Sequence, residues 1–377
     1  MSGKDLVEII GRFPEGVSPA ELEGEVPYSR ATLNRRLREA LAAGELLAEG
    51  TGPVTRYRST DPLAAIRAYF ERPANERKSV PYREELLEVT PALAQIPLAA
   101  LAGVPRYEPD RRAFSRFLID FSCASSALEG GTYSLLDTQV LIDYGERAPD
   151  KPVSDGALVL NHKNALEALY DHRSLDAIFK IHELLTDDHG LAALQDSEHF
   201  LPQPHRGVAR EYNDVNIHQS AYLPPFRPGT GYVASSLSTI LDRARAIQHP
   251  IQASFYLLTR IPYLQPFVDG NKRLARVLCN VPLLNAKLPP ISFVDFRKRD
   301  YLIGMLAFYE LGDTLPIGRC FVDAYKRSIA RLGLQMRAPT PVLPEALVPG
   351  GEKVLLDERE VANEWAIDPT EEQDLGR

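Results

Sequence analysis

The chain has 377 residues, a hydrophobic fraction of 44% and a formal net charge of −8 at pH 7. Single domains are typically about 100–200 residues long, so this length predicts more than one folded unit. No apolar run approaches the roughly 20 residues that cross a bilayer, and the first residues lack the apolar core of a signal peptide. We therefore expect a cytoplasmic protein without membrane contact, and the acidic charge argues against a chain that coats nucleic acid along its whole surface.

Residues 1–60 are expected to fold as a winged helix-turn-helix domain. Apolar spacing predicts a short helix over residues 5–13, and Ser18 opens a capping box for a second helix. Ser29 is the expected N-cap of a third helix, which ends before Gly44. The segments on either side of the following Gly-Thr-Gly-Pro turn are expected to pair as a hairpin.

The third of these helices is basic although the whole chain is acidic. Its apolar residues share one face, which leaves Asn34, Arg35 and Arg38 pointing outward. Such side chains can reach base edges and phosphates in a major groove, and Arg56 on the hairpin is placed to contact backbone phosphate. We predict DNA binding through these four residues, in a homodimer as is usual for winged-helix proteins. A purely structural or protein-binding module is the alternative.

The rest of the chain is predicted to be mainly helical. Residues 61–109 are interrupted by prolines and are expected to form a helical connector, and residues 110–330 form a helical bundle with one β element around residues 208–217. Residues 331–377 are rich in proline and acidic residues, so a disordered tail or interaction arm is expected. The helices predicted in the bundle span residues 112–127, 134–144, 158–170, 175–185, 232–246, 250–263, 271–286 and 300–311.

The three cysteines and eight histidines of the chain do not suggest a metal site. Cys123, Cys279 and Cys320 are far apart in the sequence, and the histidines are scattered without the spacing of zinc ligands. We therefore expect buried, reduced thiols and no structural zinc.

The segment of residues 264–276 has the residues of an anion site. Gly270 and Asn271 form a turn whose backbone N–H groups can face an anion, and the helix that begins near Asn271 adds the positive end of its dipole. Arg273 and Arg276 are three residues apart, so both guanidinium groups project from one side of this helix. The pattern predicts a site that holds neighbouring phosphate groups.

The same segment has one residue suited to a metal and none suited to proton transfer. Asp269 supplies a hard oxygen ligand for Mg²⁺, which needs few protein ligands when the substrate brings phosphate oxygens. Lys272 adds a further positive charge that favours phosphate. The position before the Pro-Phe pair is Gln265, whose amide has no useful basicity near neutral pH.

This segment resembles the signature of the Fic family, His-Pro-Phe-x-Asp/Glu-Gly-Asn-Gly-Arg-x-x-Arg, at ten of twelve positions. The resemblance implies a Fic-type helical bundle with a small β-hairpin flap over residues 110–330, beside the winged helix. It also implies ATP binding at Gly270, Asn271, Lys272, Arg273 and Arg276 with Mg²⁺ at Asp269. The reaction it implies is transfer of AMP to a serine, threonine or tyrosine hydroxyl of another protein.

A second stretch resembles the family's inhibitory motif, Ser/Thr-x-x-x-Glu-Gly/Asn. Ser125 and Glu129 lie at its two ends. The resemblance implies that Glu129 pairs with Arg276 and blocks the γ-phosphate position, and a carboxylate can indeed compete with phosphate for one guanidinium. Taken alone, Glu129 would be interpreted as a helix-end carboxylate in water.

Residues 206–217 resemble the family's flap, which holds a target peptide by strand addition. The resemblance implies target docking at Gly207, Arg210, Val215 and Ile217. An exposed strand edge of this kind binds an extended peptide through main-chain hydrogen bonds.

Two departures from the signature bear on the chemistry. Gln265 replaces the histidine that serves the family as general base, and loss of a general base costs roughly 10²- to 10⁴-fold in rate. Lys272 replaces a glycine, as in the related Doc branch, which acts as a kinase and keeps the histidine. We therefore expect a weak or inactive adenylyltransferase. The alternative is a DNA-binding regulator in which the Fic core serves as a nucleotide-sensing or dimerisation module.

Overall fold

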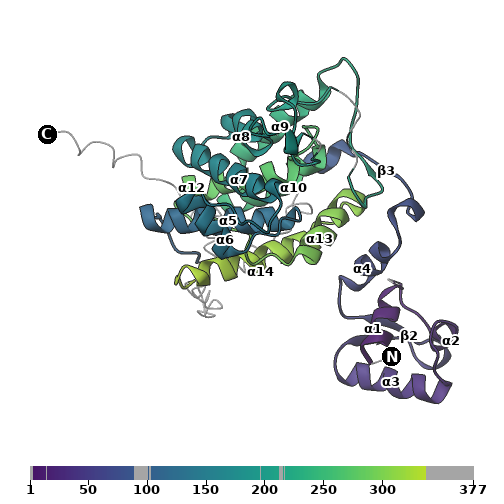
Figure 1. Ribbon diagram of the computed structural model, residues 1–377. Coiled ribbons are helices and arrows are strands. Elements are labelled where there is room, and N and C mark those ends of the chain that lie inside the picture. The colour runs from purple at the N-terminus through teal and green to yellow at the C-terminus, as the bar shows by residue number, and fades with distance from the viewer. Residues whose placement is uncertain are drawn as a thin grey trace, which may run out of the picture. The chain divides into compact units, whose positions relative to one another are not determined.

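The computed structural model describes residues 3–13, 15–88, 101, 103–195, 197–211, 215 and 217–336 (Figure 1). Most of the predicted tail, residues 337–377, lies outside this set, and so do residues 89–100 of the predicted connector and 212–214 of the predicted flap. None of the described helices is long and apolar enough to cross a membrane.

The N-terminal module contains three helices followed by a β-hairpin, in the order that the sequence predicts. The helices are α1 (Gly3–Gly11), α2 (Pro19–Glu23) and α3 (Arg30–Ala42), and the antiparallel strands are β1 (Leu46–Glu49) and β2 (Arg56–Ser59). Both expected caps are present: Ser18 Oγ accepts from Glu21 N at 3.3 Å, and Ser29 Oγ accepts from Thr32 N at 3.4 Å. A separate small core holds the module together; its fully buried members include Leu6, Ile10, Val17, Leu22, Leu33 and Leu37.

The connector is helical at first but then adds a strand. Helix α4 (Ala64–Glu71) is followed by β3 (Val80–Pro81), which pairs in parallel with β4 (Tyr222–Leu223). Beside this pair, the buried carboxylate of Glu310 lies 3.1 Å from the Arg77 guanidinium. A buried ion pair must be well hydrogen-bonded to offset its desolvation, and Glu310 also accepts from Ser220 and from the backbone of Ala221. The connector is therefore fixed to residues far away in sequence.

The bundle is built around one helix that is buried on almost every side. That helix is α10 (Pro250–Leu264), and it packs against α9 (Tyr232–Ala246), α11 (Asn271–Leu278), α12 (Asn280–Asn285) and α13 (Lys298–Leu311). A helix that is apolar all round belongs at the centre of a domain. The helices α5 (Arg111–Leu128), α6 (Leu135–Tyr144), α7 (Val153–His172) and α8 (Ile178–Leu185) complete the part of the bundle that carries the site (Figure 1).

Three features of the bundle differ from the prediction. The helix expected over residues 271–286 is interrupted at Cys279, because Pro282 has no N–H to donate to the carbonyl of Leu278. A further helix, α14 (Leu315–Arg331), follows α13 after a left-handed turn at Gly312. The β element expected around residues 208–217 is absent from the part of that segment which the structure describes, where no strand occurs.

Candidate nucleotide site

The loop between α10 and α11 depends on two residues with left-handed backbone. Gln265 ends α10 with a φ of 51°, and Gly270 precedes α11 with a φ of 78°. A Cβ atom on residue 270 would lie 3.0 Å from the Thr186 side chain, so only glycine fits there without displacement. The first bond of the α11 ladder joins Leu274 N to the carbonyl of Gly270 at 2.8 Å. The backbone N–H groups of the three residues before Leu274 therefore precede the ladder and face the loop.

Asn271 holds the loop closed with its side chain. Its Oδ1 accepts from the backbone N–H of Phe267 at 3.0 Å, and its Nδ2 donates to the carbonyl of Phe267 at 2.8 Å. Nδ2 also donates to Oε1 of Gln265 at 2.7 Å. The amide is thus fully used inside the loop, and what Asn271 can offer a ligand is its backbone N–H.

The side chain of Gln265 is committed to the same network. It is 7% exposed, and while its Oε1 accepts from Asn271, its Nε2 donates to the carbonyl of Pro262 at 2.7 Å. Its own carbonyl accepts from Arg210 Nε at 2.6 Å. An amide in this position stabilises the loop, since both its oxygen and its nitrogen are hydrogen-bonded within it.

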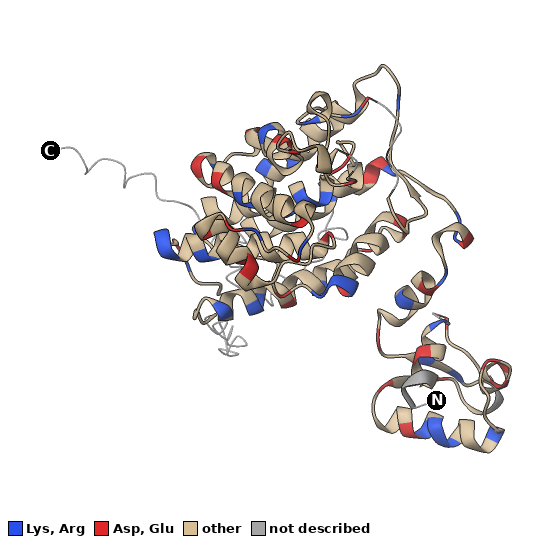
Figure 2. Cartoon of the chain, viewed as in Figure 1, with Lys and Arg blue, Asp and Glu red and all other residues tan. Residues whose placement is uncertain are grey.

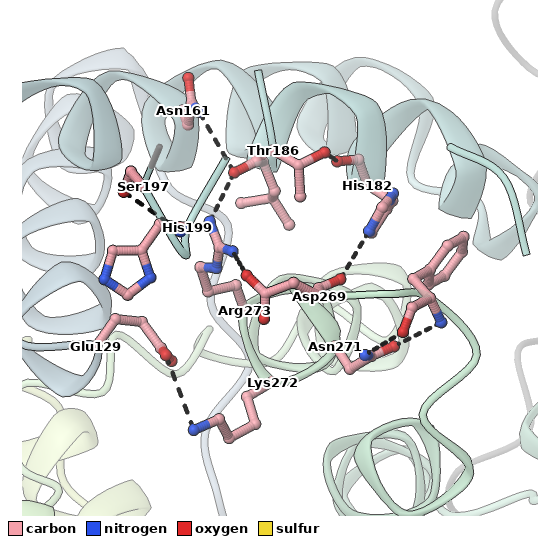
Figure 3. Close-up of polar contacts among 12 residues, drawn as sticks. Glu129, Asn161, His182, Thr186, Ser197, His199, Asp269, Asn271, Lys272 and Arg273 are labelled. Atoms are coloured by element: carbon pink, nitrogen blue, oxygen red, sulfur yellow. Dashed lines mark hydrogen bonds and ion pairs between the residues drawn. The ribbon is translucent and has the colours of Figure 1, made fainter. Parts of the chain in front are cut away.

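Arg273 is the first of two buried guanidinium groups beside the loop. Only 1% of its side chain is exposed, and its Nη2 lies 2.5 Å from the Asp269 carboxylate (Figure 3). Its Nη1 donates to the carbonyl of Leu185 at 2.9 Å, which orients the group. The Asp269 side chain is 44% exposed, so this carboxylate can exchange its partner or meet a cation from solvent.

Arg276 is the second buried guanidinium group beside the loop, and its side chain has no exposed surface. Its Nη2 donates to Oε1 of Glu129 at 2.6 Å, and its Nε donates to Ser125 Oγ at 2.8 Å. The ammonium of Lys272 lies 3.8 Å from the other oxygen of Glu129 (Figure 3). The predicted pair of Glu129 with Arg276 is therefore present in the structure.

Glu129 is held by these cations and not by its helix. It lies at the C-terminal end of α5, where the helix dipole disfavours a negative charge, and its side chain is only 11% exposed. Burial raises the pKa of this carboxyl, but Arg276, Lys272 and Arg273 outweigh burial and hold the pKa far below its usual range. The alternative of a helix-end carboxylate in water is therefore wrong.

Three histidines of the site were not identified from the sequence. His182 stacks on Phe267 at 3.8 Å between ring centroids, its Nε2 donates to the carbonyl of Asp269, and its Nδ1 accepts from the backbone N–H of Gly207. Burial lowers the pKa of His182 to about 4 and that of His162, which contacts Ser125, to about 3. Both are therefore neutral at physiological pH. The sequence signal for His162 and His182 is a polar residue at a helical position where the apolar spacing predicts a buried side chain.

The third, His199, comes from the loop between α8 and β4. Figure 3 places its imidazole beside Glu129, on the Arg273 side of the site. Its backbone N–H donates to Ser197 Oγ at 3.4 Å. Burial, and then the charge of Arg273, lower its pKa. No sequence signal pointed to this residue.

Two of the four residues predicted to dock a target protein instead hold their segment against the site. Arg210 is 4% exposed, and besides contacting Gln265 its backbone N–H donates to the carbonyl of Pro266 at 2.9 Å. A Cβ atom on Gly207 would lie 2.7 Å from a carbonyl oxygen of α8. These two positions therefore fix the first part of the predicted flap, residues 206–217, to the site. Ile217 packs against the main core and Val215 is half-buried, and target docking there stays a prediction.

One carboxylate could take part in metal binding. Among the described residues no group of three or more histidine, cysteine, aspartate or glutamate side chains could hold a metal ion. Asp269 fits Mg²⁺ only where a ligand brings further oxygens, which is how this ion is usually bound beside phosphates.

On the N-terminal module, three of the four predicted DNA-contacting residues lie on α3, along which Figure 2 shows basic residues, and the fourth, Arg56, lies on β2. Arg35 and Arg38 are exposed and Asn34 is half-buried. Arg35 pairs with Glu39 at 2.8 Å, within the same helix. Arg56 is tied to its own module, because its Nη2 donates to the carbonyl of Gly16 at 2.9 Å.

Comparison with known proteins assigns the central part of the chain. Residues 173–283 match the model of the Fic/DOC family, so the chain carries a Fic/DOC domain. The protein adenylyltransferase Fic of Nematostella vectensis is 27% identical over 228 residues, which are 58% of this chain and 51% of that protein. The protein adenylyltransferase fic-1 of Caenorhabditis elegans is 25% identical over 246 residues, 63% of this chain and 44% of that protein. The chain thus spans about half the length of these curated relatives.

A solved structure gives the same assignment for the fold. A Fic family protein from Desulfovibrio desulfuricans superposes with a TM-score of 0.51 at 22% identity, covering 65% of this chain and 75% of that chain. The mainly helical Fic-type fold predicted from the sequence is confirmed.

Proposed function

We propose that the loop of residues 264–276, together with Glu129, is an ATP site that the chain itself keeps closed. The observation that carries this proposal is a pair of buried guanidinium groups on α11, each paired with a carboxylate. A buried charge without a partner is costly, so both arginines need an anion at all times. Phosphate oxygens can replace a carboxylate on a guanidinium with the same two-pronged geometry. Binding is then an exchange of anions.

Each charged side chain has a distinct part in this proposal. Arg273 and Arg276 hold the phosphate groups, Lys272 adds a positive charge at the mouth, and Glu129 competes with the ligand for Arg276. Asp269 would hold Mg²⁺, which neutralises phosphate charge when bound. The backbone N–H groups before the α11 ladder supply donors that no side-chain substitution removes.

The relatives are named as protein adenylyltransferases, and for this chain we propose the same reaction at a low rate or not at all. The relatives' names support AMP transfer to a protein hydroxyl, and the site retains the charged groups for nucleotide binding. Gln265 gives no base of useful strength near neutral pH, and its amide oxygen and nitrogen are hydrogen-bonded to Asn271 and Pro262. We therefore expect ATP binding without efficient turnover.

Calorimetry of ATP with Mg²⁺ tests the binding proposal. Glu129→Gly frees Arg276 from its competitor and is expected to tighten ATP binding by about 10-fold or more, the worth of a charge-assisted hydrogen bond. Glu146→Gly removes an exposed carboxylate outside the site and serves as the matched control, for which affinity stays unchanged. Equal affinity in the native chain and in Glu129→Gly, or no binding to either, contradicts the proposal.

Labelled nucleotide then identifies the chemistry. ATP labelled at the α-phosphate marks a protein target when AMP is transferred, whereas label at the γ-phosphate marks it only when a phosphoryl group is transferred, as Lys272 could suggest. We expect weak α-label and no γ-label with Glu129→Gly in lysate. Transfer of γ-label would replace the adenylylation proposal with a kinase.

A second function, DNA binding by a homodimer, is proposed for the N-terminal module. Three helices and a hairpin are the elements of a winged helix, and Arg35 and Arg38 are exposed on the outer face of α3. A gel shift with the chain's own upstream DNA tests it. Arg35→Ala with Arg38→Ala should abolish the shift, while Arg12→Ala, an exposed arginine outside α3, should not. Binding that does not weaken as salt rises contradicts the proposal, because phosphate contacts release counterions.

A further inference from the structure

Arg276 has a second anchor besides Glu129, and this anchor reaches it from two other helices. Its Nε donates to Ser125 Oγ on α5 at 2.8 Å, and the same hydroxyl lies 2.8 Å from Nε2 of His162 on α7. Nδ1 of His162 lies 2.7 Å from the carbonyl of Leu158, one turn earlier on α7. Ser125, His162 and Arg276 are all fully buried.

The chemistry of these groups fixes the direction of each hydrogen bond that links Leu158, His162, Ser125 and Arg276. A carbonyl only accepts, so the proton of His162 is on Nδ1 and is donated to Leu158. Nε2 is then an acceptor and takes the hydroxyl proton of Ser125. The serine oxygen therefore turns a lone pair toward Arg276, whose Nε–H it accepts. Burial, followed by the charges of Arg276 and Arg273, keeps the imidazole neutral and preserves this order at physiological pH.

The side chains of Glu129 and Ser125 bind different nitrogens of Arg276, and only the contact with Glu129 has to break when a ligand binds. Glu129 binds Nη2, the nitrogen that a ligand would have to take over. The Ser125 hydroxyl binds Nε, and the Ser125 carbonyl accepts from Nη2 at 3.4 Å, so neither contact with Ser125 has to break while the anion on Nη2 changes. The remaining nitrogen, Nη1, is buried and donates to none of the described residues. An arginine held by Nε alone still presents both Nη groups as a fork.

We propose that His162 is a positioning residue which, through the Ser125 hydroxyl, keeps Arg276 aimed at a bound phosphate after Glu129 has been displaced. This inference rests on the proposed ATP site. While Glu129 is present, either anchor suffices and His162 is of little consequence for the arginine. Once Glu129 has left, the Ser125 hydroxyl, held in turn by His162, keeps the Nε of the guanidinium in place.

The neighbouring serine provides a matched control. Ser126 is also buried, and its Oγ lies 3.2 Å from Nδ1 of His162, but the serine hydroxyl that accepts from Arg276 is that of Ser125. Ser125→Ala and Ser126→Ala therefore remove the same group from adjacent positions around one imidazole. His162→Gln and His162→Asn make a second pair. A glutamine carbonyl reaches the Nε2 position and can still accept from Ser125, whereas asparagine reaches only the Nδ1 position.

Calorimetry of ATP and Mg²⁺ binding to the full chain tests the proposal, with every variant made both in the native chain and in Glu129→Gly. In Glu129→Gly, Ser125→Ala and His162→Asn should each weaken ATP binding by about 10-fold, the worth of one charge-assisted hydrogen bond. Ser126→Ala and His162→Gln should stay within about 2-fold, in line with the small net worth of a neutral hydrogen bond. With Glu129 in place all four variants should differ little. AMP, which lacks the outer phosphates, should lose less affinity than ATP.

The outcomes separate this inference from the proposed function. If Glu129→Gly binds ATP but Ser125→Ala and Ser126→Ala behave alike in it, the positioning role of His162 is wrong and the ATP site stands. If His162→Gln weakens binding as much as His162→Asn, the acceptor at Nε2 is not what matters. If Glu129→Gly binds no ATP, both proposals fall together. Should His162→Asn not fold, as melting curves would reveal, the serine pair decides the question.

Discussion

The arginines of the proposed nucleotide site and those of α3 lie in opposite environments. The side chains of Arg273 and Arg276 are 1% and 0% exposed, whereas 62% of the Arg35 side chain is exposed. All three have a carboxylate partner within 3 Å. Exposed pairs contribute about 0–1 kcal/mol, while removing one partner of a buried pair typically costs about 3–5 kcal/mol. The same contact is therefore a strong constraint in one region and a weak one in the other.

The difference explains what each region can do. A buried guanidinium cannot return to water when its carboxylate leaves, so another anion must come in, and this makes the site selective for anions. An exposed arginine exchanges its carboxylate for water or for any phosphate at little cost. Such a surface suits contacts with the phosphates of a nucleic acid, which weaken as the salt concentration rises. The two proposed functions therefore use one residue type in two physical regimes.

Breaking the buried pair from one side should have the largest effect. Arg276→Met leaves Glu129 ionised and buried without its main partner, and should lower the free energy of unfolding by about 3–5 kcal/mol. The double variant Arg276→Met, Glu129→Leu removes both charges and should recover most of that loss. Urea unfolding of the two single variants and the double variant measures the coupling. Additive losses would mean that the pair is not the buried, desolvated contact seen here.

Restoring the base should have the next largest effect, on rate instead of stability. Gln265→His in the Glu129→Gly background supplies an imidazole where the chain now has a non-basic amide, and should raise AMP transfer by roughly 10²-fold. Initial rates with α-labelled ATP measure it. The same double variant with Asp269→Ala is the control, since it should lose the gain together with metal binding. An unchanged rate would place the defect elsewhere than in the missing base.

The buried histidines predict acid sensitivity. The pKa values of His162 and His182 fall to about 3 and about 4 in the folded protein, so below the usual value of 6.5 the unfolded chain binds protons that the folded chain does not. The free energy of unfolding should then decrease by about 1.4 kcal/mol per pH unit for each histidine as the pH drops from 6.5 to about 4. Urea unfolding at pH 7.5 and 5 measures this, and His182→Gln should reduce the slope. His205→Gln, an exposed control, should leave it unchanged.

The comparison also shows what the sequence could predict. Helix starts at Ser18 and Ser29 follow from local capping chemistry, and the structure has both caps. The pairing of Glu129 with Arg276 was implied by a motif, although the two residues are 147 positions apart in the sequence. Spacing alone gives no such partner.

What the sequence could not predict depends on contacts between distant segments. The pairing of β3 with β4 joins the connector to the segment after the flap, and two-residue strands have no periodicity to detect. The commitment of the Gln265 amide depends on Asn271 closing the loop, which motif matching does not reveal. His162 is one of eight histidines in the chain, and only folding brings it to Ser125.

The smallest effect is expected for the exposed pair of Arg35 and Glu39 on α3. Glu39→Ala removes the partner of Arg35, and because the pair is exposed and one turn apart in α3 the free energy of unfolding should change by no more than about 0.5 kcal/mol. The same change frees Arg35 and removes a negative charge beside it, so DNA affinity should rise slightly at low salt and not at high salt. Urea unfolding and a salt series of gel shifts measure the two effects. A loss of stability near that of Arg276→Met would show that exposure does not separate the two regions, and unchanged DNA binding at low salt would take α3 out of the interface.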